Sequence, residues 1–180
     1  LDLRDQSYNR FFFQGADLVN ASLDYRYRYK NFTFFGELAG SDNGGMAQIH
    51  GLMLGLDRYV DLSFVYRNYG VDYQALNARP FGETNGGRNE NGIYMGVELR
   101  PGKHWRVNAY YDIFRFPYLR FNIDGPSEGH EYRFRVTYWQ KRKLETYLEI
   151  RSETKGYGTD GDESGFANLD PVVPRTRFQA

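Results

Sequence analysis

Hydrophobic and polar residues alternate along most of this chain. Between residues 23 and 29 every second residue is Leu or Tyr, and the residues between them are Asp or Arg. A period of two is the spacing of a β-strand whose two faces meet different surroundings. Helical spacing fits none of these windows. The same alternation predicts strands at residues 60–67, 93–100, 105–113, 131–138 and 144–151, and less cleanly at 32–39 and 46–56.

The connections between these strands alternate in length. Short turns fall at residues 30–31, 57–59, 101–104 and 140–143, and long connections at 40–45, 70–91, 116–129 and 154–174. Outer-membrane β-barrels consist of strands of about nine to eleven residues joined by periplasmic turns and longer outer loops. The sequence therefore predicts an all-β fold, an antiparallel up-and-down transmembrane β-barrel, as a single domain over residues 1–180.

We expect this barrel to be a segment of a larger one. Beyond the eight predicted strands, parts of two more are expected, one around Phe11, Phe12 and Phe13 and one after Pro174. The chain begins with Leu1 rather than Met, and its last pattern stops within a few residues. Eight strands are enough to close a narrow barrel, whereas ends that look cut favour a wider one.

Each predicted strand has an apolar face for lipid and a charged face for a wet barrel interior, because only a closed sheet pairs all its backbone groups in hydrocarbon. The residues expected to face lipid are Leu23, Tyr25, Tyr27, Leu62, Phe64, Ile93, Val97, Val107, Phe134, Val136, Leu148 and Ile150. The charges expected in the lumen are Arg26, Arg28, Arg67, Glu98, Arg100, Arg106, Asp112, Glu131, Arg133, Arg135, Glu145, Glu149 and Arg151. We interpret these charges as a ladder of cross-strand pairs that fixes the register. A pore lining is their alternative role.

Aromatic residues are unusually frequent, with 16 Tyr, 14 Phe and 2 Trp making 18% of the chain. Tyr29, Tyr59, Trp105 and Tyr138 fall at strand ends, where the amphipathic rings of a membrane-interface girdle belong. The mean hydropathy of −0.70 fits such a barrel, because half of each strand faces water. The alternative is a water-soluble antiparallel barrel of the lipocalin type, with the aromatic face as its core. That core would have to find partners for several buried Tyr hydroxyl groups.

Composition excludes several other classes of protein. The 23 Lys and Arg residues balance 23 Asp and Glu residues, and because nucleic-acid-binding surfaces carry a basic excess, we expect no direct nucleic-acid contact by this chain. Cys is absent, which excludes disulfides, thiolate metal sites and cysteine catalysis. No apolar run of about 18 residues is present, so no transmembrane helix is predicted.

Several segments together resemble a family of Bacteroidetes outer-membrane proteins known as helix-hairpin-helix (ComEA-like) domain proteins. The resemblance covers most of the chain from about residue 21 onward. It rests on residues 35–39 (FGELA), 60–63 (VDLS), 66–69 (YRNY), 81–83 (FGE), 89–96 (NENGIYMG), 109–117 (AYYDIFRFP), 124–127 (DGPS) and 168–175 (NLDPVVPR).

This resemblance implies a longer protein with a signal peptide, a small periplasmic helical domain and a large barrel. This chain would be a portion of that barrel. No helix-hairpin-helix pattern occurs in the 180 residues. A part in DNA uptake, through the missing periplasmic domain, is therefore an alternative function that no residue of this chain carries.

Candidate chemistry is sparse. His50, His104 and His130 lack the spacing of metal ligands, so no metal site and no cofactor is predicted. Asp160, Asp162 and Glu163 offer oxygen ligands of the kind that Ca²⁺ prefers. Their EF-hand-like spacing stops short, so we interpret them as a solvated acidic loop.

A rim-located outer-membrane enzyme is a further alternative. Asp112, His130 and Glu131 lie near strand ends on one loop side, which is a suitable place for such a site. No nucleophile, base and orienting group can be assembled from the spacing. We therefore assign no catalytic residue and do not expect an enzyme. Pro117 and the turn at residues 124–127 give the connection at 116–129 two rigid points, and we expect it to fold onto the barrel.

The leading hypothesis is a segment of a β-barrel in the bacterial outer membrane with a structural, transport or scaffolding role. Its expected partners are outer-membrane lipid, lipopolysaccharide and other proteins of the envelope.

Overall fold

The computed structural model describes residues 7–84, 86–121, 123, 125–141, 143–157 and 173–179. A 3-10 helix, η1 (Ser7–Asn9), precedes nine strands in this part of the chain. Their bounds are β1 (Asn20–Tyr29), β2 (Phe32–Ser41), β3 (Met46–Asp57), β4 (Val60–Tyr69), β5 (Glu90–Gly102), β6 (Trp105–Phe116), β7 (Ser127–Gln140), β8 (Leu144–Tyr157) and β9 (Val173–Gln179).

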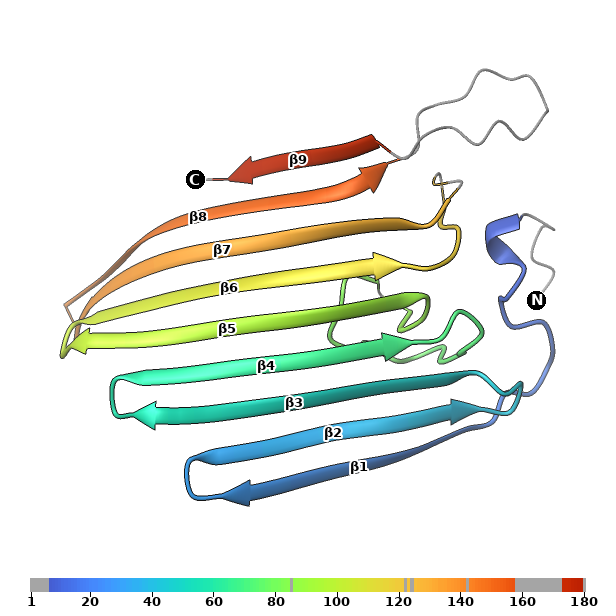
Figure 1. The fold of residues 1–180 in the computed structure, drawn as a ribbon, viewed down its shortest axis with the longest axis horizontal. Helices are drawn as coiled ribbons and strands as arrows, with labels where there is room; N and C mark the ends of the chain where they lie inside the picture. The colour runs from blue at the N-terminus through green and yellow to red at the C-terminus, as the bar shows by residue number, and fades with distance from the viewer. Residues whose placement is uncertain are drawn as a thin grey trace.

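The strands form one sheet in which each strand pairs with the next along the chain (Figure 1). Every pairing is antiparallel. The short turns all lie at one end of the sheet and the longer connections at the other, although the β2–β3 connection is only residues 42–45. The predicted all-β, antiparallel, up-and-down topology is therefore confirmed.

The sheet is open in the described part of the chain, with β1 and β9 as its two edges. Nine strands that alternate in direction leave β1 and β9 running the same way, so these two edges cannot join in an antiparallel pair. The predicted closure into a barrel is thus not made by these nine strands alone.

The register gives the sheet two different faces, which we call face A and face B. One row of cross-strand partners reads Tyr27, Phe34, Leu52, Phe64, Met95, Tyr111, Tyr132 and Ser152, and we define face A as its side. The neighbouring row reads Arg26, Phe35, Gly51, Val65, Tyr94, Asp112, Glu131 and Glu153, and we define face B as its side. Adjacent residues of a strand point to opposite faces, so the register assigns every paired residue to one of them.

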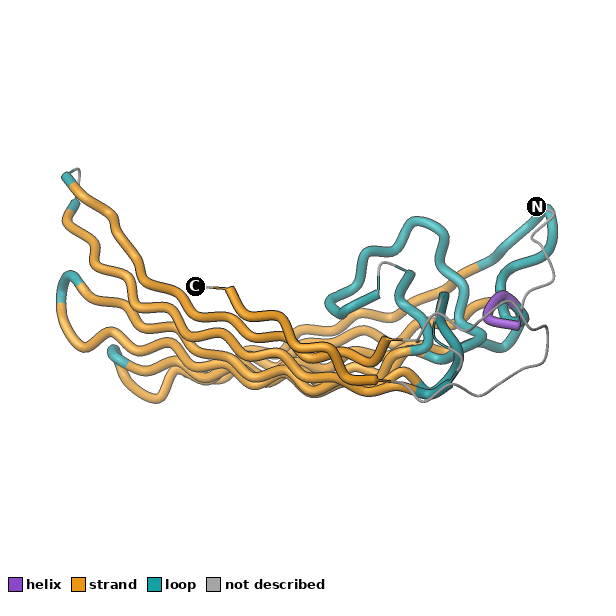
Figure 2. The backbone as a smooth tube through the Cα atoms, turned by 90° about the horizontal axis from the view of Figure 1, so that it is seen from above, coloured by secondary structure: helices purple, strands orange, loops and turns teal. Residues whose placement is uncertain are grey.

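The buried core lies on face B at the end of the long connections. Phe114 and Phe116 are almost fully buried, and Ala47, Tyr69 and Tyr73 pack together nearby. Burial raises the pKa of Tyr73, and the charge of Glu37 adds to this shift. The connections lie on the side toward which the sheet curves (Figure 2). Face B is consequently open near the short turns and covered beneath the loops.

The N-terminal aromatic residues do not form the expected strand. Phe11, Phe12 and Phe13 follow η1 and pack against the long connections. The Phe13 N–H donates to Oε1 of Gln74 at 3.2 Å, and Nε2 of Gln74 donates to the Phe11 carbonyl. These main-chain groups are held by a side chain instead of a strand ladder, so the prediction of a partial strand here was wrong. The partial strand expected after Pro174 corresponds to β9.

Gly36 provides a test of this register. It is buried on face A between Tyr25 and His50, where the Tyr25 hydroxyl and His50 Nδ1 are 2.6 Å apart. A Cβ atom at Gly36 would lie 2.5 Å from the Ile49 carbonyl oxygen. We expect Gly36→Ala to lower the free energy of unfolding in urea by about 1–3 kcal/mol, as overpacking does.

Gly40→Ala is the matched control in the same strand, since its new Cβ would have no neighbour nearer than 3.8 Å. Equal stability of the two variants would contradict the close packing around Gly36.

Candidate functional site: a buried charge centre on face B

Three charged residues from neighbouring strands meet on face B. Nε of Arg67 (β4) donates to Oε1 of Glu90 (β5) at 2.6 Å, and Nη1 donates to Oδ1 of Asp112 (β6) at 2.8 Å. The side chains of Arg67 and Glu90 are 0% exposed and that of Asp112 is 8% exposed. Two carboxylates around one guanidinium leave a net charge of −1 in this centre, which we call the Arg67 centre.

The Arg67 centre holds down the connection between β4 and β5. Glu90 accepts hydrogen bonds from the N–H groups of Glu83 and Thr84 at 3.0 Å and from the Thr84 hydroxyl at 3.1 Å. The Phe81 ring lies over the guanidinium of Arg67 at 5.5 Å. Because Glu90 bonds to both the loop and Arg67, the loop and the strands share one polar network.

Glycine makes room for this arrangement. Gly92 is the cross-strand partner of Arg67, and a Cβ atom there would lie 2.5 Å from Cζ of Arg67. A Cβ atom at Gly82 would lie 2.7 Å from Oε1 of Glu90. Nη2 of Arg67 is buried without a hydrogen-bond partner among the described residues. The guanidinium is therefore enclosed on the strand side by Gly92 and on the loop side by Phe81.

The neighbouring long connection is fixed to the first one. The Asn89 side chain accepts from the Tyr118 N–H at 2.8 Å and donates to the Tyr118 carbonyl at 2.9 Å. Ile123 is buried, and Nη2 of Arg120 donates to the Ser127 hydroxyl at 3.0 Å. Arg88 lies over the Phe12 ring at 3.4 Å, and burial lowers its pKa. The connection after β6 thus folds onto the sheet end, as its rigid points suggested.

A second polar cluster continues from the Arg67 centre across β6, β7 and β8. Glu131 accepts from the Tyr110 hydroxyl and from Nη2 of Arg151, the latter at 2.6 Å. Arg135 donates to Glu149. Nζ of Lys155 is 2.5 Å from Oε2 of Glu83, so β8 also holds the β4–β5 connection.

Toward the short turns, face B becomes an open polar trough. Arg100 pairs with Asp61 and with Glu98, the latter at 2.7 Å, and Arg106 lies 3.7 Å from Glu98. A hollow of about 360 Å³ follows this region, with Ser63 and Tyr110 in its lining. The side chains of Arg100 and Asp61 are 38% and 42% exposed, so their charges are accessible to water and polar solutes. Water-exposed pairs of this kind contribute little to stability.

The residues predicted for the lumen share one face. By register and alternation all thirteen lie on face B, and the twelve residues predicted to face lipid all lie on face A. Ten of the thirteen charges take part in ion pairs, namely Arg67, Glu98, Arg100, Arg106, Asp112, Glu131, Arg133, Arg135, Glu149 and Arg151. Arg26, Arg28 and Glu145 have no ion pair within the described residues.

The grouping proposed for a rim enzyme does not form. Asp112 and Glu131 are cross-strand partners on face B, whereas His130 pairs with Ile113 on face A. The strand alternation therefore places His130 on the opposite side of the sheet from both carboxylates. Asp112 is paired with Arg67, and Glu131 with Arg151.

The histidines, which the sequence analysis did not assign to a metal site, make local contacts. Nε2 of His50 lies 3.1 Å from Oε1 of Gln48, and Nδ1 of His104 lies 2.9 Å from the Trp139 carbonyl. No cluster of metal-ligand residues occurs in the described part of the chain. Asp160, Asp162 and Glu163 lie outside the described residues.

Glu90 was missed because the sequence analysis assigned residues 70–91 to a loop. In the structure it is the first residue of β5 and is in phase with Gly92, Tyr94 and Glu98 on face B. The alternation of every second residue, continued from Glu98 back to Glu90, could have placed Glu90 on this face from the sequence. No sequence signal pointed to the contact between Phe81 and Arg67.

Comparisons with known proteins give no relative: no family model, no curated protein and no solved structure matches the chain. Among the described residues, no helix has both the length and the apolar character needed to cross a membrane.

The Arg67 centre predicts a specific response to mutation. Arg67→Leu would leave the buried carboxylates of Glu90 and Asp112 without their cation, and breaking a buried pair in this way costs about 3–5 kcal/mol. We expect the free energy of unfolding to fall by this amount and trypsin to cleave after Arg88 much faster, because the β4–β5 connection loses its anchor.

Arg106→Leu is the control on the same face, because the Arg106 side chain is 59% exposed and its pair is long. Its expected cost is below about 1 kcal/mol. If both variants lost the same stability and the bond after Arg88 stayed protected from trypsin, the anchoring role of Arg67 would be excluded.

Proposed function

We propose that this chain is a portion of a transmembrane β-barrel of the bacterial outer membrane, with face A toward lipid and face B toward the interior. Its role in this proposal is structural, transport-related or scaffolding, and it is not an enzyme. Its partners are outer-membrane lipid, lipopolysaccharide and other envelope proteins. We also propose kinship with the helix-hairpin-helix (ComEA-like) barrel proteins of Bacteroidetes, which rests on the sequence segments alone.

The division of side chains between the faces carries the proposal. Among paired positions of β1–β8, the exposed large hydrophobic residues lie on face A except for Met53, Trp139 and Tyr147. Three charged residues occupy paired positions of face A in β1–β8. Arg115 and Glu128 oppose each other at the long-connection end of the sheet, and Asp57 pairs with Val60 beside a short turn. A face this apolar is compatible with hydrocarbon, in which charged side chains are costly.

The exposure of face A argues against a water-soluble barrel. Phe64 in β4 is 40% exposed, and the cross-strand partners Phe134 in β7 and Ile150 in β8 are 45% and 46% exposed. In a lipocalin-like fold these side chains would fill a dry centre. An apolar surface spanning eight strands exceeds what soluble monomers leave uncovered, so it needs another apolar phase against it.

The strand number supports a larger barrel. In lipid, the free N–H and C=O groups of β1 and β9 must be paired. An antiparallel up-and-down sheet closes with an even number of strands, as bacterial barrels do. Nine strands therefore require at least one further strand between the two edges.

The folded-in β4–β5 connection favours a narrowed interior over an open pore. It covers the Arg67 centre at the long-connection end, while the polar trough remains open toward the short turns. A solute that moves along face B would meet the part of this connection that contains Phe81. In a transport role, the connection would therefore limit the passage of solutes.

Cysteine labelling of the reconstituted protein tests the orientation of the faces, and the absence of native Cys gives a clean background. We expect Ser63→Cys and Thr137→Cys, on face B, to react with a water-soluble maleimide. Phe64→Cys and Val136→Cys, their neighbours on face A, should react at least about tenfold more slowly because lipid excludes the reagent.

Membrane association supplies the second readout. The protein should stay with the membrane fraction after a carbonate wash. Recovery in the soluble fraction, or faster labelling at positions 64 and 136 than at 63 and 137, would refute the proposed orientation.

A further inference from the structure

The short-turn end of the sheet is basic. The four short turns, residues 30–31, 58–59, 103–104 and 141–143, contain six Lys or Arg residues and no Asp or Glu. Among the described residues of the connections at 42–45, 70–89 and 117–126, at the other end, three Asp or Glu residues balance three Lys or Arg residues. The neutral total charge of the chain therefore hides an excess of positive charge at the turn end.

The basic side chains of the turns are available to a partner. Lys30, Arg58, Lys103, Lys141 and Lys143 are all exposed. None of them belongs to an ion pair among the described residues. The strand arginines of the same end behave differently, since Arg100 and Arg106 pair with carboxylates. The charge of the turns is thus unneutralised by the protein itself.

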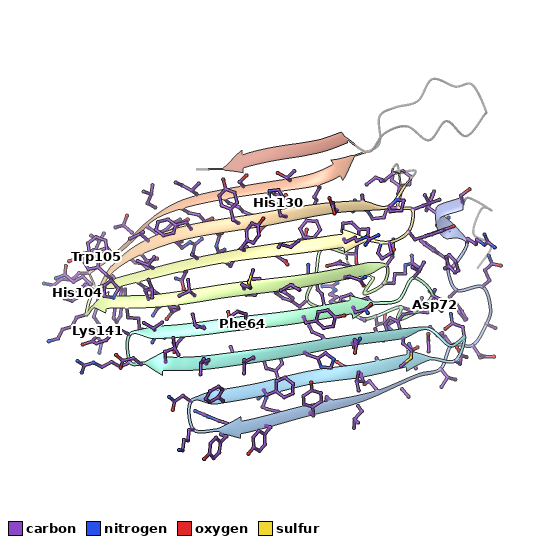
Figure 3. The ribbon with its side chains drawn as sticks, viewed as in Figure 1. Phe64, Asp72, His104, Trp105, His130 and Lys141 are labelled. Carbon is purple, nitrogen blue, oxygen red and sulfur yellow. The ribbon has the colours of Figure 1, made fainter. Side chains whose placement is uncertain are left out.

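Amphipathic aromatic residues adjoin these turns on face A. Trp105, directly after the turn at 103–104, is 49% exposed, and its ring packs edge-on against Tyr138 at 5.0 Å. Tyr29 on the same face is exposed beside its turn, and Tyr59 is exposed within the turn at 58–59. Figure 3 shows His104, Trp105 and Lys141 together at the turn end of the sheet, far from Asp72 at the other end.

We infer that the turn end binds the anionic headgroups of phospholipids, with Lys103, Lys141 and Lys143 around a headgroup whose chains lie beside Trp105. This inference rests on the proposed function, because it needs face A in contact with acyl chains. Charge complementarity selects the headgroup: each Lys or Arg near an anionic membrane surface attracts it by about 1 kcal/mol, which is about fivefold in binding. The aromatic ring beside the turn marks the depth of the headgroup layer.

The experiment measures quenching of Trp105 by brominated lipids in the complete protein, reconstituted in phosphatidylcholine bilayers. Trp139→Phe serves as the background, because this chain has only two Trp residues and Trp139 lies on face B. Brominated phosphatidylglycerol and brominated phosphatidylcholine are compared at equal fractions. We expect a preference for phosphatidylglycerol of at least about fivefold at low salt, falling as NaCl screens the charges.

Charge variants locate the effect. The triple substitution Lys103→Gln, Lys141→Gln and Lys143→Gln should remove the preference for phosphatidylglycerol. The control removes three exposed charges from the other end, by Arg10→Gln, Arg79→Gln and Arg115→Gln, and should keep it. Equal loss in both triple variants would overturn the inference, because net charge and not the turn end would then set the preference.

Two further outcomes separate this inference from the proposed function. Equal quenching of Trp105 by the two brominated lipids would overturn the headgroup inference and leave the lipid contact of face A intact. Quenching by neither lipid would overturn the proposed function, and the headgroup inference with it.

Discussion

The strict alternation of the strands is the constraint on which this structure depends. Successive side chains point to opposite faces, so a shift of one residue in any pairing would carry charges into face A and apolar rings into face B. The row from Tyr27 through Phe64 to Tyr132 stays in phase across the sheet. The same shift would also separate the ion pairs on face B, such as that between Arg135 and Glu149, which makes it less favourable still.

The Arg67 centre turns this two-faced sheet into a structure with a specific interior. Removing charges from water is costly, so a buried ion pair is weak evidence for stability by itself. Here the ion pair fixes the position of the β4–β5 connection, because Glu90 bonds to Arg67 and also to the N–H groups of Glu83 and Thr84. The ion pairs of Arg67 join the strands alone, whereas the hydrogen bonds from residues 83 and 84 to Glu90 form only when the loop lies on the sheet.

The open strand edges and the basic short turns are two features whose energetic cost depends on the surrounding medium. Unpaired strand edges are tolerable in water but not in hydrocarbon. Unneutralised lysines are tolerable in water and favourable beside anionic lipid. In the proposed setting, therefore, the edges need further strands, and the turn end is satisfied by the membrane surface.

The positions of the strands and the membership of the two faces could be predicted from the sequence, because both follow from the local period of two. The residues from Leu23 to Tyr29 are sufficient to show it, and a local pattern does not depend on distant parts of the chain. Burial of Arg67, by contrast, required the β4–β5 connection to return over the sheet. That return depends on backbone N–H groups at residues 83 and 84, which every residue except proline possesses, so no side-chain pattern marks it.

The same reasoning explains one prediction that was wrong and one alternative grouping that does not form. Phe11 to Phe13 have strand-like composition, yet the Gln74 side chain takes their backbone hydrogen bonds, a contact about sixty residues away in the chain. Asp112, His130 and Glu131 are near in position along two paired strands, but one residue of offset places His130 across the sheet. The sequence alone determined which residues alternate. Only the tertiary structure decided which parts of a face are covered, because this depends on contacts between segments that are far apart in the chain.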